Sequence, residues 1–338
     1  MKTNDFSYYI HKFLVIYLPN EKAASINTLD TYRYTFILYL EFQKTKNILA
    51  DKITIKDFTR QSVVEFLNWL ENNRNSSIST RNNRLACIFS FCRFLQYEYP
   101  DYLNNYNDIL NIPMKKADKK IVSYIDIDGI KILLEQPNIN TKKGYRDYMI
   151  LLILYESAIR VSELIMLKVG DFNLKKPYYL KVLGKGKKER IIPLHEKIAL
   201  KVKEYFNSIN IANKPEHLVF FNSRKEQLTR MGITYILQGY VEIARETTDY
   251  NFPKITPHIL RHSKAMNLLQ HDVNLIYIRD MLGHTSIQIT EIYARADSKR
   301  KREAIENAYE NIITNEEPEW KDKNVLDWLK QFKKRLVM

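Results

Sequence analysis

Glycine, proline and cysteine are all scarce in this chain of 338 residues, which holds 8 glycines, 10 prolines and 2 cysteines. An all-β protein needs many tight turns, so the shortage of turn residues favours a mainly helical fold. Two cysteines exclude a disulfide framework, and without histidines at matching spacing they do not make a zinc site. Cys87 and Cys92 lie five residues apart in a Phe-rich run, so we expect both thiols to be buried.

Long apolar runs are also missing. No stretch reaches the length of a transmembrane helix, and the N-terminus lacks a charged-then-apolar signal pattern, so we expect no membrane association and a cytoplasmic location. Acidic residues are outnumbered, with 39 Asp and Glu against 53 Lys and Arg, which gives a net charge of +14. Residues 1–120 hold 17 basic and 12 acidic residues, and residues 121–338 hold 36 and 27. Both parts are therefore suited to a polyanion such as nucleic acid.

Apolar side chains recur at helical spacing through the first hundred residues and predict four helices. These helices begin near Phe6, Thr28, Thr59 and Ser77, and Thr59 is placed to act as the N-cap of the third. Four helices of this size form one compact bundle. Periodicity is lost over residues 100–123, which marks a domain boundary.

The second part of the chain mixes helical and β patterns. Residues 146–167 read as one long buried helix and its continuation, with Arg160 interrupting the apolar stretch. Residues 178–193 form two short β-runs around a Gly-Lys-Gly turn, which predicts a hairpin. The fold class is therefore mainly α, with two domains and a small β-hairpin or sheet in the second. We assign residues 1–112 to a helical domain, 113–123 to a basic linker, 124–314 to the second domain and 315–338 to a tail helix.

Residues able to act on a phosphodiester are spread along the second domain: Arg160, Lys185, His258, Arg261, His284 and Tyr293. Two arginines can hold phosphate oxygens, a tyrosine can attack phosphorus, and a lysine or histidine can move protons. His258 and Arg261 are three residues apart, so on a helix they would face the same way.

Each of these residues also has a plainer interpretation. An ion pair with Glu163 would account for Arg160, a solvated turn for Lys185, and a helix cap with a surface arginine for His258 and Arg261. His284 could simply follow a helix that ends at Gly283. The chain has 23 tyrosines, so any one of them, taken alone, is seldom a nucleophile. The order and spacing of the whole set favour the functional interpretation.

The set and its order resemble the tyrosine recombinases, also called the phage-integrase family. The resemblance rests on Tyr-Glu-Ser-Ala-Ile-Arg160, His258-Ile-Leu-Arg261, Leu-Gly-His284 and Tyr293 nine residues later. One departure is Ala158, where the family commonly has glycine. The segment from His262 through residue 298 looks most like recombinases carried on bacterial transposons, and we take His262 itself as structural.

The resemblance implies a two-domain clamp around duplex DNA, with a small helical core-binding domain of SAM-like type and a catalytic domain. It implies that Tyr293 attacks the scissile phosphate to give a 3′-phosphotyrosyl link, while Lys185 protonates the departing 5′ oxygen. His284 would support the attacked phosphate by a hydrogen bond. No metal and no cofactor is implied, because guanidinium groups meet the charge on the phosphate.

The expected partners are double-stranded DNA recombination sites and further copies of the chain. We expect a monomer in free solution and a homotetramer on two paired sites, with other recombinases among the candidate partners. The tail helix would dock either on its own domain or on a neighbour. Candidate DNA contacts outside the six are Arg81, Arg84, Lys115, Lys116, Lys119, Lys120 and Lys187.

Two other functions remain open on sequence alone. A type IB topoisomerase-like enzyme would use the same chemistry to relax DNA, and a catalytically idle protein would use the same clamp only to bind it. Solvated faces are the plainer interpretation of Arg81 and Arg84, and a solvated linker is that of the four lysines between 115 and 120.

Overall fold

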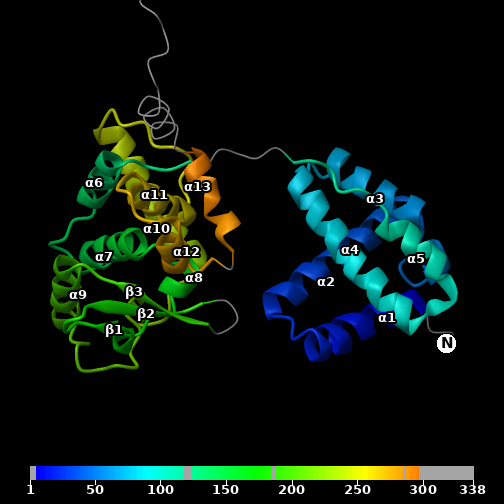
Figure 1. Cartoon of the computed structure of the whole chain (residues 1–338), viewed down its shortest axis with the longest axis horizontal. Coiled ribbons are helices and arrows are strands. Elements are labelled where there is room, and N and C mark those ends of the chain that lie inside the picture. Colours follow the sequence, from blue (N-terminus) through cyan, green and yellow to red (C-terminus); the bar gives the residue numbers. More distant parts are fainter. Residues whose placement is uncertain (1–4, 118–122, 185–187, 285, 297–338) are drawn as a thin grey trace, which may run out of the picture. The chain divides into compact units, whose positions relative to one another are not determined.

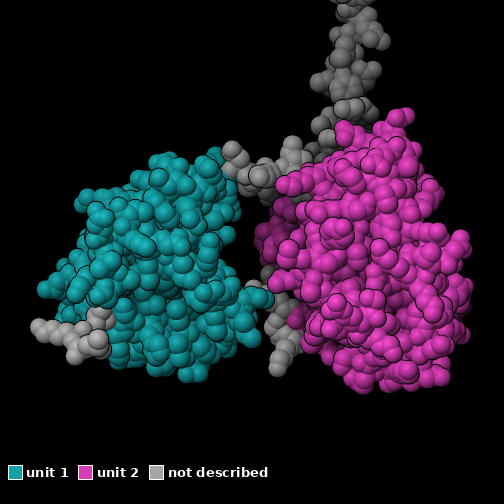
Figure 2. Space-filling model, turned by 180° about the vertical axis from the view of Figure 1, so that it is seen from behind, with its two compact units in different colours: residues 1–120 teal, residues 121–338 magenta. Residues whose placement is uncertain are grey.

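The computed structural model describes residues 5–117, 123–184, 188–284 and 286–296 (Figure 1). The chain divides into two compact units, residues 1–120 and residues 121–338 (Figure 2). Within the described residues, no helix is long and apolar enough to cross a membrane. The predicted mainly helical fold with a small sheet is confirmed.

The first unit is a bundle of helices. Its elements are α1 (Asp5–His11), a π-helix (Lys12–Glu21), α2 (Ile26–Thr45), α3 (Arg60–Asn72), α4 (Ile78–Glu98) and α5 (Leu103–Leu110), with short 3-10 turns at Ile55–Asp57 and Pro100–Tyr102. Thr59 is the N-cap of α3 as predicted, since its side chain accepts a hydrogen bond from the Ser62 amide. Helix α5 was not predicted; it is short, and it is held by burying Tyr106 and Ile109 in the bundle.

The core of this bundle is aromatic. Phe91 lies at its centre and contacts Phe13 and Phe36, with ring centroids 5.2 and 4.9 Å apart. Cys87 and Cys92 on the same helix are both buried and free, as the sequence predicted. The unit is therefore stabilised by burial of aromatic surface and not by a covalent link.

The second unit combines a small sheet with helices. Its helices are α6 (Ile127–Glu135), α7 (Lys142–Ser157), α8 (Val161–Leu164), α9 (Glu196–Ser208), α10 (Arg230–Thr247), α11 (Pro257–Gln270), α12 (Leu275–Leu282) and α13 (Glu291–Ala296). The antiparallel sheet has the order β1 (Phe172–Asn173), β2 (Tyr179–Leu183) and β3 (Glu189–Pro193). Strands β2 and β3 are the predicted hairpin, whereas the two-residue β1 was not predicted.

Helix α7 ends earlier than the sequence suggested. The predicted continuous helix over residues 146–167 breaks after Ser157, because Ala158 adopts a left-handed conformation with φ of 49°. The chain then restarts as α8, with Arg160 as its N-cap residue. Left-handed backbone favours glycine, the residue that we expected at this position from the family pattern. The break takes Arg160 out of a helix interior and turns it toward the C-terminal end of α12.

Candidate active site

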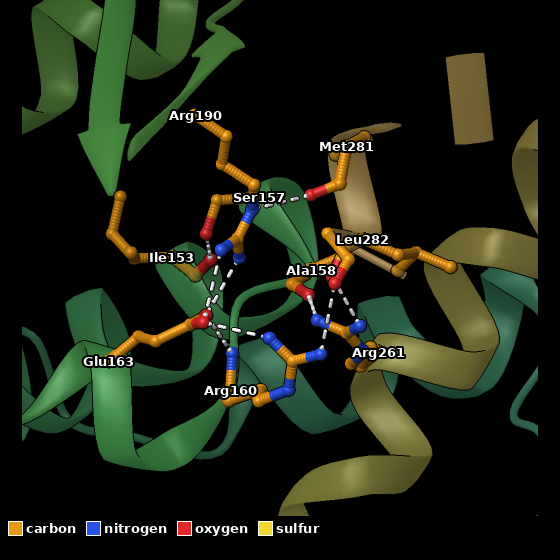
Figure 3. A network of polar contacts seen from close by, with 10 residues as sticks. Ile153, Ser157, Ala158, Arg160, Glu163, Arg190, Arg261, Met281 and Leu282 are labelled. Atoms are coloured by element: carbon orange, nitrogen blue, oxygen red, sulfur yellow. Dashed lines mark hydrogen bonds and ion pairs between the residues drawn. The ribbon is translucent and has the colours of Figure 1, made fainter. Parts of the chain in front are cut away.

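Three arginines from different elements meet at the C-terminal end of α12 (Figure 3). Arg190 on β3 donates from Nε to the Met281 carbonyl (3.0 Å), and Arg261 on α11 donates to the Leu282 carbonyl (2.5 Å). Arg160 donates to the next carbonyl, that of Gly283 (3.2 Å). Carbonyls in the last turn of a helix lack partners within the helix and carry partial negative charge, so they attract cations.

One carboxylate lies between two of these arginines. Glu163, which is buried, accepts from the side chain of Arg160 (2.9 Å) and accepts two bonds from Arg190 (3.0 and 2.7 Å). Burial raises the pKa of Glu163, but the hydrogen bonds from Arg190 and Arg160 outweigh it and leave the pKa below its ordinary value. Glu163 therefore remains ionised and holds the two guanidinium groups beside each other.

Arg160 and Arg261 differ in exposure. Arg261 is 4% exposed and also donates to the Ala158 carbonyl at 2.8 Å, so the break after α7 helps to fix it. Burial and the neighbouring charge of Arg160 lower the pKa of Arg261 to about 10, which still leaves it charged at neutral pH. The side chain of Arg160 is 30% exposed, so its guanidinium faces solvent as well as Glu163. The ion pair of Arg160 with Glu163 is therefore present, and part of the Arg160 side chain remains exposed to solvent.

The two predicted histidines face the arginines with neutral rings. His258 and Arg261 lie on the first turns of α11, as their spacing predicted, and His258 is solvent-exposed while Arg261 is buried. Loss of surrounding water and the charges of Arg261 and Arg160 lower the pKa of His258. His284 follows Gly283, the left-handed cap of α12, and its Nδ1 lies 3.0 Å from the hydroxyl of Thr290. Burial, and then Arg261 and Arg160, lower the pKa of His284 to about 4.

Tyr293 on α13 is fully buried beside these residues. Its hydroxyl lies 2.8 Å from Nδ1 of His262, a neighbour of Arg261 on α11. Burial raises the pKa of Tyr293 to about 12, an effect that the charge of Arg261 partly opposes. Burial, together with His258 and Arg261, lowers the pKa of His262 to about 4, so a neutral ring meets a protonated phenol.

The structure thus brings five of the six predicted residues together: Arg160, His258, Arg261, His284 and Tyr293. The sixth, Lys185, lies outside the described residues, as do Lys119, Lys120 and Lys187 among the predicted DNA contacts. Of the remaining candidates, Lys116 is exposed, and Lys115 is exposed but pairs with Glu71 (2.8 Å).

Arg81 does not lie where a DNA contact requires it. Its side chain is buried, pairs with Glu71 at 3.3 Å and donates to the carbonyl of Pro113 at 3.3 Å, so it joins α4 to α3 and to the chain beyond α5. Neither a phosphate contact nor a solvated face describes this position. The sequence could not show this, because the partners lie 10 and 32 residues away. Arg84 is half-buried and donates to the Thr31 carbonyl (3.1 Å), with its guanidinium over the ring of Tyr34.

Two residues at the site were not recognised from sequence. His262 was taken as structural, yet in the described residues it is the hydrogen-bond partner of the Tyr293 hydroxyl. Arg190 was not singled out, although one signal was available. It shares a face of β3 with buried Ile192, and an arginine at an inward position of a strand needs a buried partner.

Comparisons with known proteins agree over both units. Residues 123–300 match the phage integrase family, and residues 18–101 match the phage integrase N-terminal SAM-like domain. The chain is 33% identical to the tyrosine recombinase XerD of Oceanobacillus iheyensis, covering 85% of this chain and 93% of that protein. It is 30% identical to a putative integrase/recombinase of Sinorhizobium fredii, covering 88% and 89%.

Solved structures share the fold at lower sequence identity. The XerH site-specific recombinase in its pre-cleavage complex with the difH substrate has a TM-score of 0.64 at 23% identity, covering 84% of this chain and 80% of that one. A transposon integrase in complex with transposon right end DNA has a TM-score of 0.68 at 15% identity, covering 88% and 99%.

Proposed function

We propose that this chain, which belongs to the phage integrase family and is a tyrosine-type site-specific DNA recombinase, uses Tyr293 as its nucleophile. The phenol oxygen of Tyr293 attacks the scissile phosphorus, a phosphotyrosyl bond forms on the 3′ side, and the 5′ oxygen leaves as a hydroxyl. The 5′-hydroxyl of a partner strand then attacks the phosphotyrosyl link, so a new phosphodiester forms and the phenol is released. Each phosphoester bond that breaks is matched by one that forms.

The observation that carries this assignment is the arginine cluster. Arg160 and Arg190 share one carboxylate, that of Glu163, while Arg261 donates only to backbone carbonyls, so the site holds an excess of positive charge before any substrate arrives. Arg160 presents its open edge to solvent and is the group best placed to take a phosphate oxygen, with Arg261 behind it. Positive groups fixed in advance stabilise charge that develops on the phosphoryl oxygens, at no cost of reorganisation.

The two histidines supply hydrogen bonds without adding charge. Nδ1 of the neutral His284 ring can accept a hydrogen bond from the Thr290 hydroxyl. The ring proton then lies on Nε2, where it can donate to a phosphate oxygen. His258 is neutral and exposed, and it can take or return the proton of the reacting phenol. Lys185, which follows β2 in the sequence and lies outside the described residues, is assigned by its place in the motif as the donor of a proton to the 5′ oxygen.

The proposed substrate is duplex DNA, bound as two sites by four copies of the chain. The XerH recombinase and the transposon integrase with a similar fold were solved as complexes with DNA, which supports this partner. Lys115, Lys116, Lys119, Lys120 and Lys187 remain candidate phosphate contacts, with Arg84 a weaker one because it already has protein partners. The tail from residue 315 is the proposed link between copies.

The test of the nucleophile uses a nicked suicide duplex that carries the recombination site. Wild-type protein should form a covalent adduct that survives a denaturing gel, whereas Tyr293→Phe should bind the duplex with similar affinity and form none. Tyr277→Phe, at an exposed position on α12, is the matched control and should form the adduct normally. An adduct of undiminished yield from Tyr293→Phe overturns the assignment.

A supercoiled plasmid separates recombination from simple relaxation. Recombinant products that require two cognate sites identify recombination, whereas relaxation of a plasmid lacking any site identifies a topoisomerase-like enzyme. Both activities would proceed through the same covalent adduct, so this experiment is needed in addition to the suicide substrate.

A further inference from the structure

Arg190 is the one arginine of the cluster that sequence motifs did not assign. It stands on β3, which packs against α12, and its side chain is 11% exposed. Its Nε donates to the Met281 carbonyl, and its two terminal nitrogens donate to the two oxygens of Glu163 (Figure 3). All three nitrogens therefore already have protein acceptors.

Two glycines pack directly against this side chain. A Cβ added at Gly283 would lie 3.1 Å from Cδ and from a terminal nitrogen of Arg190, and one added at Gly184 would lie 3.2 Å from the same nitrogen. Both distances are tighter than ordinary van der Waals contact. The guanidinium of Arg190 is thus enclosed by the end of β2, the end of α12 and the carboxylate of Glu163, so a substrate phosphate has little access to it.

The hydrogen bonds that Arg190 makes to Glu163 limit the bonds that Glu163 can make with the Arg160 side chain. One oxygen of Glu163 accepts from the side chains of both arginines, and the other accepts from Arg190 and from the Arg160 backbone amide (2.8 Å). Arg190 makes the two-pronged pair, and Arg160 is left with a single side-chain bond to the carboxylate. Planar guanidinium and carboxylate groups prefer two parallel bonds, so without Arg190 the buried carboxylate would take Arg160 in that way.

We propose that Arg190 is a positioning residue that keeps Glu163 occupied and thereby leaves the Arg160 guanidinium available to a phosphate oxygen. Arg190 does not touch the substrate; it acts through Glu163 on Arg160, and through the Met281 carbonyl on the turn that carries His284. The proposal rests on the proposed function for its kinetic consequence, since the assigned role of Arg160 is to bind the scissile phosphate.

If Arg190 acts through Glu163, a second substitution at Glu163 should partly restore the activity that is lost on replacing Arg190. A purely structural role for Arg190 does not predict this rescue. Arg190→Met should lower the single-turnover rate of adduct formation by about a hundredfold, the scale expected when a catalytic group is misplaced, with little change in DNA affinity. Adding Glu163→Gln removes the competing negative charge, so the double variant should recover roughly tenfold, a partial rescue below the ~10²–10³ expected for restoring one charge donor completely. Arg190→Lys keeps the charge but not the fork, and it should fall between wild type and Arg190→Met.

Arg146 provides a matched control in the same unit. Arg146 makes the same kind of contacts, donating twice to buried Asp147 and once to the Phe221 carbonyl, and its side chain is 18% exposed. Arg146→Met should cost stability as Arg190→Met does but should leave the rate of adduct formation within about threefold in the folded protein. A double variant that is no faster than Arg190→Met, or equal rate losses at Arg146 and Arg190, would overturn the proposal.

A measurement on the free protein keeps the inference separate from the proposed function. Nitrogen-15 NMR of the arginine side chains follows the Nε–H of Arg160, assigned from its loss in Arg160→Lys. In Arg190→Met this signal should shift and exchange more slowly with solvent, and adding Glu163→Gln should reverse both changes. If the Arg160 signal is the same in wild type and in Arg190→Met, the inference is wrong even if Tyr293 forms its adduct. A signal that responds supports it even if no adduct forms, in which case only the proposed function fails.

Discussion

The hydrogen bond between Tyr293 and His262 can be tested by removing the ring nitrogens of His262. Burial raises the pKa of Tyr293 to about 12 and lowers that of His262 to about 4, so full transfer of the phenol proton to this ring is strongly unfavourable in the resting protein. That cost arises before any bond to phosphorus forms. We therefore expect His262 to hold the resting tyrosine in place, and not to act as its base.

The variant His262→Phe keeps a ring but removes the nitrogen. It leaves the Tyr293 hydroxyl buried without its partner, which typically costs about 1–3 kcal/mol. This cost falls on the resting state, so the free energy of unfolding should drop by about that amount. Because the tyrosine must leave His262 to reach a phosphate, the barrier to attack should not rise. We expect adduct formation at saturating protein to be unchanged or up to about tenfold faster, since about 1.4 kcal/mol corresponds to one factor of ten.

Two measurements decide whether His262 only holds the resting Tyr293 in place or acts as its general base. A double-mutant cycle of His262→Phe and Tyr293→Phe in chemical denaturation gives their coupling energy, which we expect to be about 1 kcal/mol. Single-turnover adduct formation on the suicide duplex gives the kinetic effect, with His271→Phe at the exposed end of α11 as the control. A loss of a hundredfold or more with intact DNA binding would refute the reasoning, because general bases typically contribute about 10²–10⁴.

Three further outcomes are expected. Lys185→Ala should impair cleavage of normal DNA, and a 5′-bridging phosphorothiolate should restore it selectively, because a thiolate leaves without a proton; equal impairment on both substrates contradicts the general-acid role. Arg81→Met should lower the free energy of unfolding by about 3 kcal/mol. This is the lower end for a broken buried ion pair, because Lys115 still neutralises the Glu71 carboxylate. The same variant should leave the slope of DNA affinity against salt concentration unchanged. The folded-state pKa of about 4 for His284 lies below its unfolded value, so its contribution to stability is complete above about pH 6.5 and is lost as the pH falls toward 4; denaturation curves of wild type and His284→Asn should converge over that window.

Local sequence signals predicted much of the fold and most of the site. The shortage of turn residues and the helical spacing of apolar side chains indicated a helical protein, and Thr59 marked a helix start that the structure confirms. The Gly-Lys-Gly turn indicated the β2–β3 hairpin. The spacing of His258 and Arg261 on one helical turn, and Gly283 as a helix end, placed site residues correctly. The family resemblance is also confirmed, over both units.

What the sequence could not show depends on contacts between distant segments. Arg81 was a candidate DNA contact, with a solvated face as the plainer interpretation, but it is buried and its charge is neutralised by Glu71 on another helix. Arg190 and His262 looked like ordinary neighbours of the motif residues, and only their partners 27 and 31 residues away give them a role. Local periodicity contains no information on such pairs, because it fixes a face of an element and not the residue opposite that face.

The way the arginines are held also matches the site to a transition state. Three guanidinium groups meet at the end of α12, and two of them bind Glu163. The carboxylate carries one negative charge and a helix C-terminus about half of one, which leaves an excess of about 1.5 positive charges. A phosphodiester carries one negative charge, and attack by a phenolate gives a pentacoordinate species with two. The excess therefore exceeds the charge of the bound substrate and approaches that of the transition state, which is the condition for binding to lower a barrier. Because the carbonyls of Ala158, Leu282 and Gly283 already hold the arginines, this charge is fixed before DNA arrives.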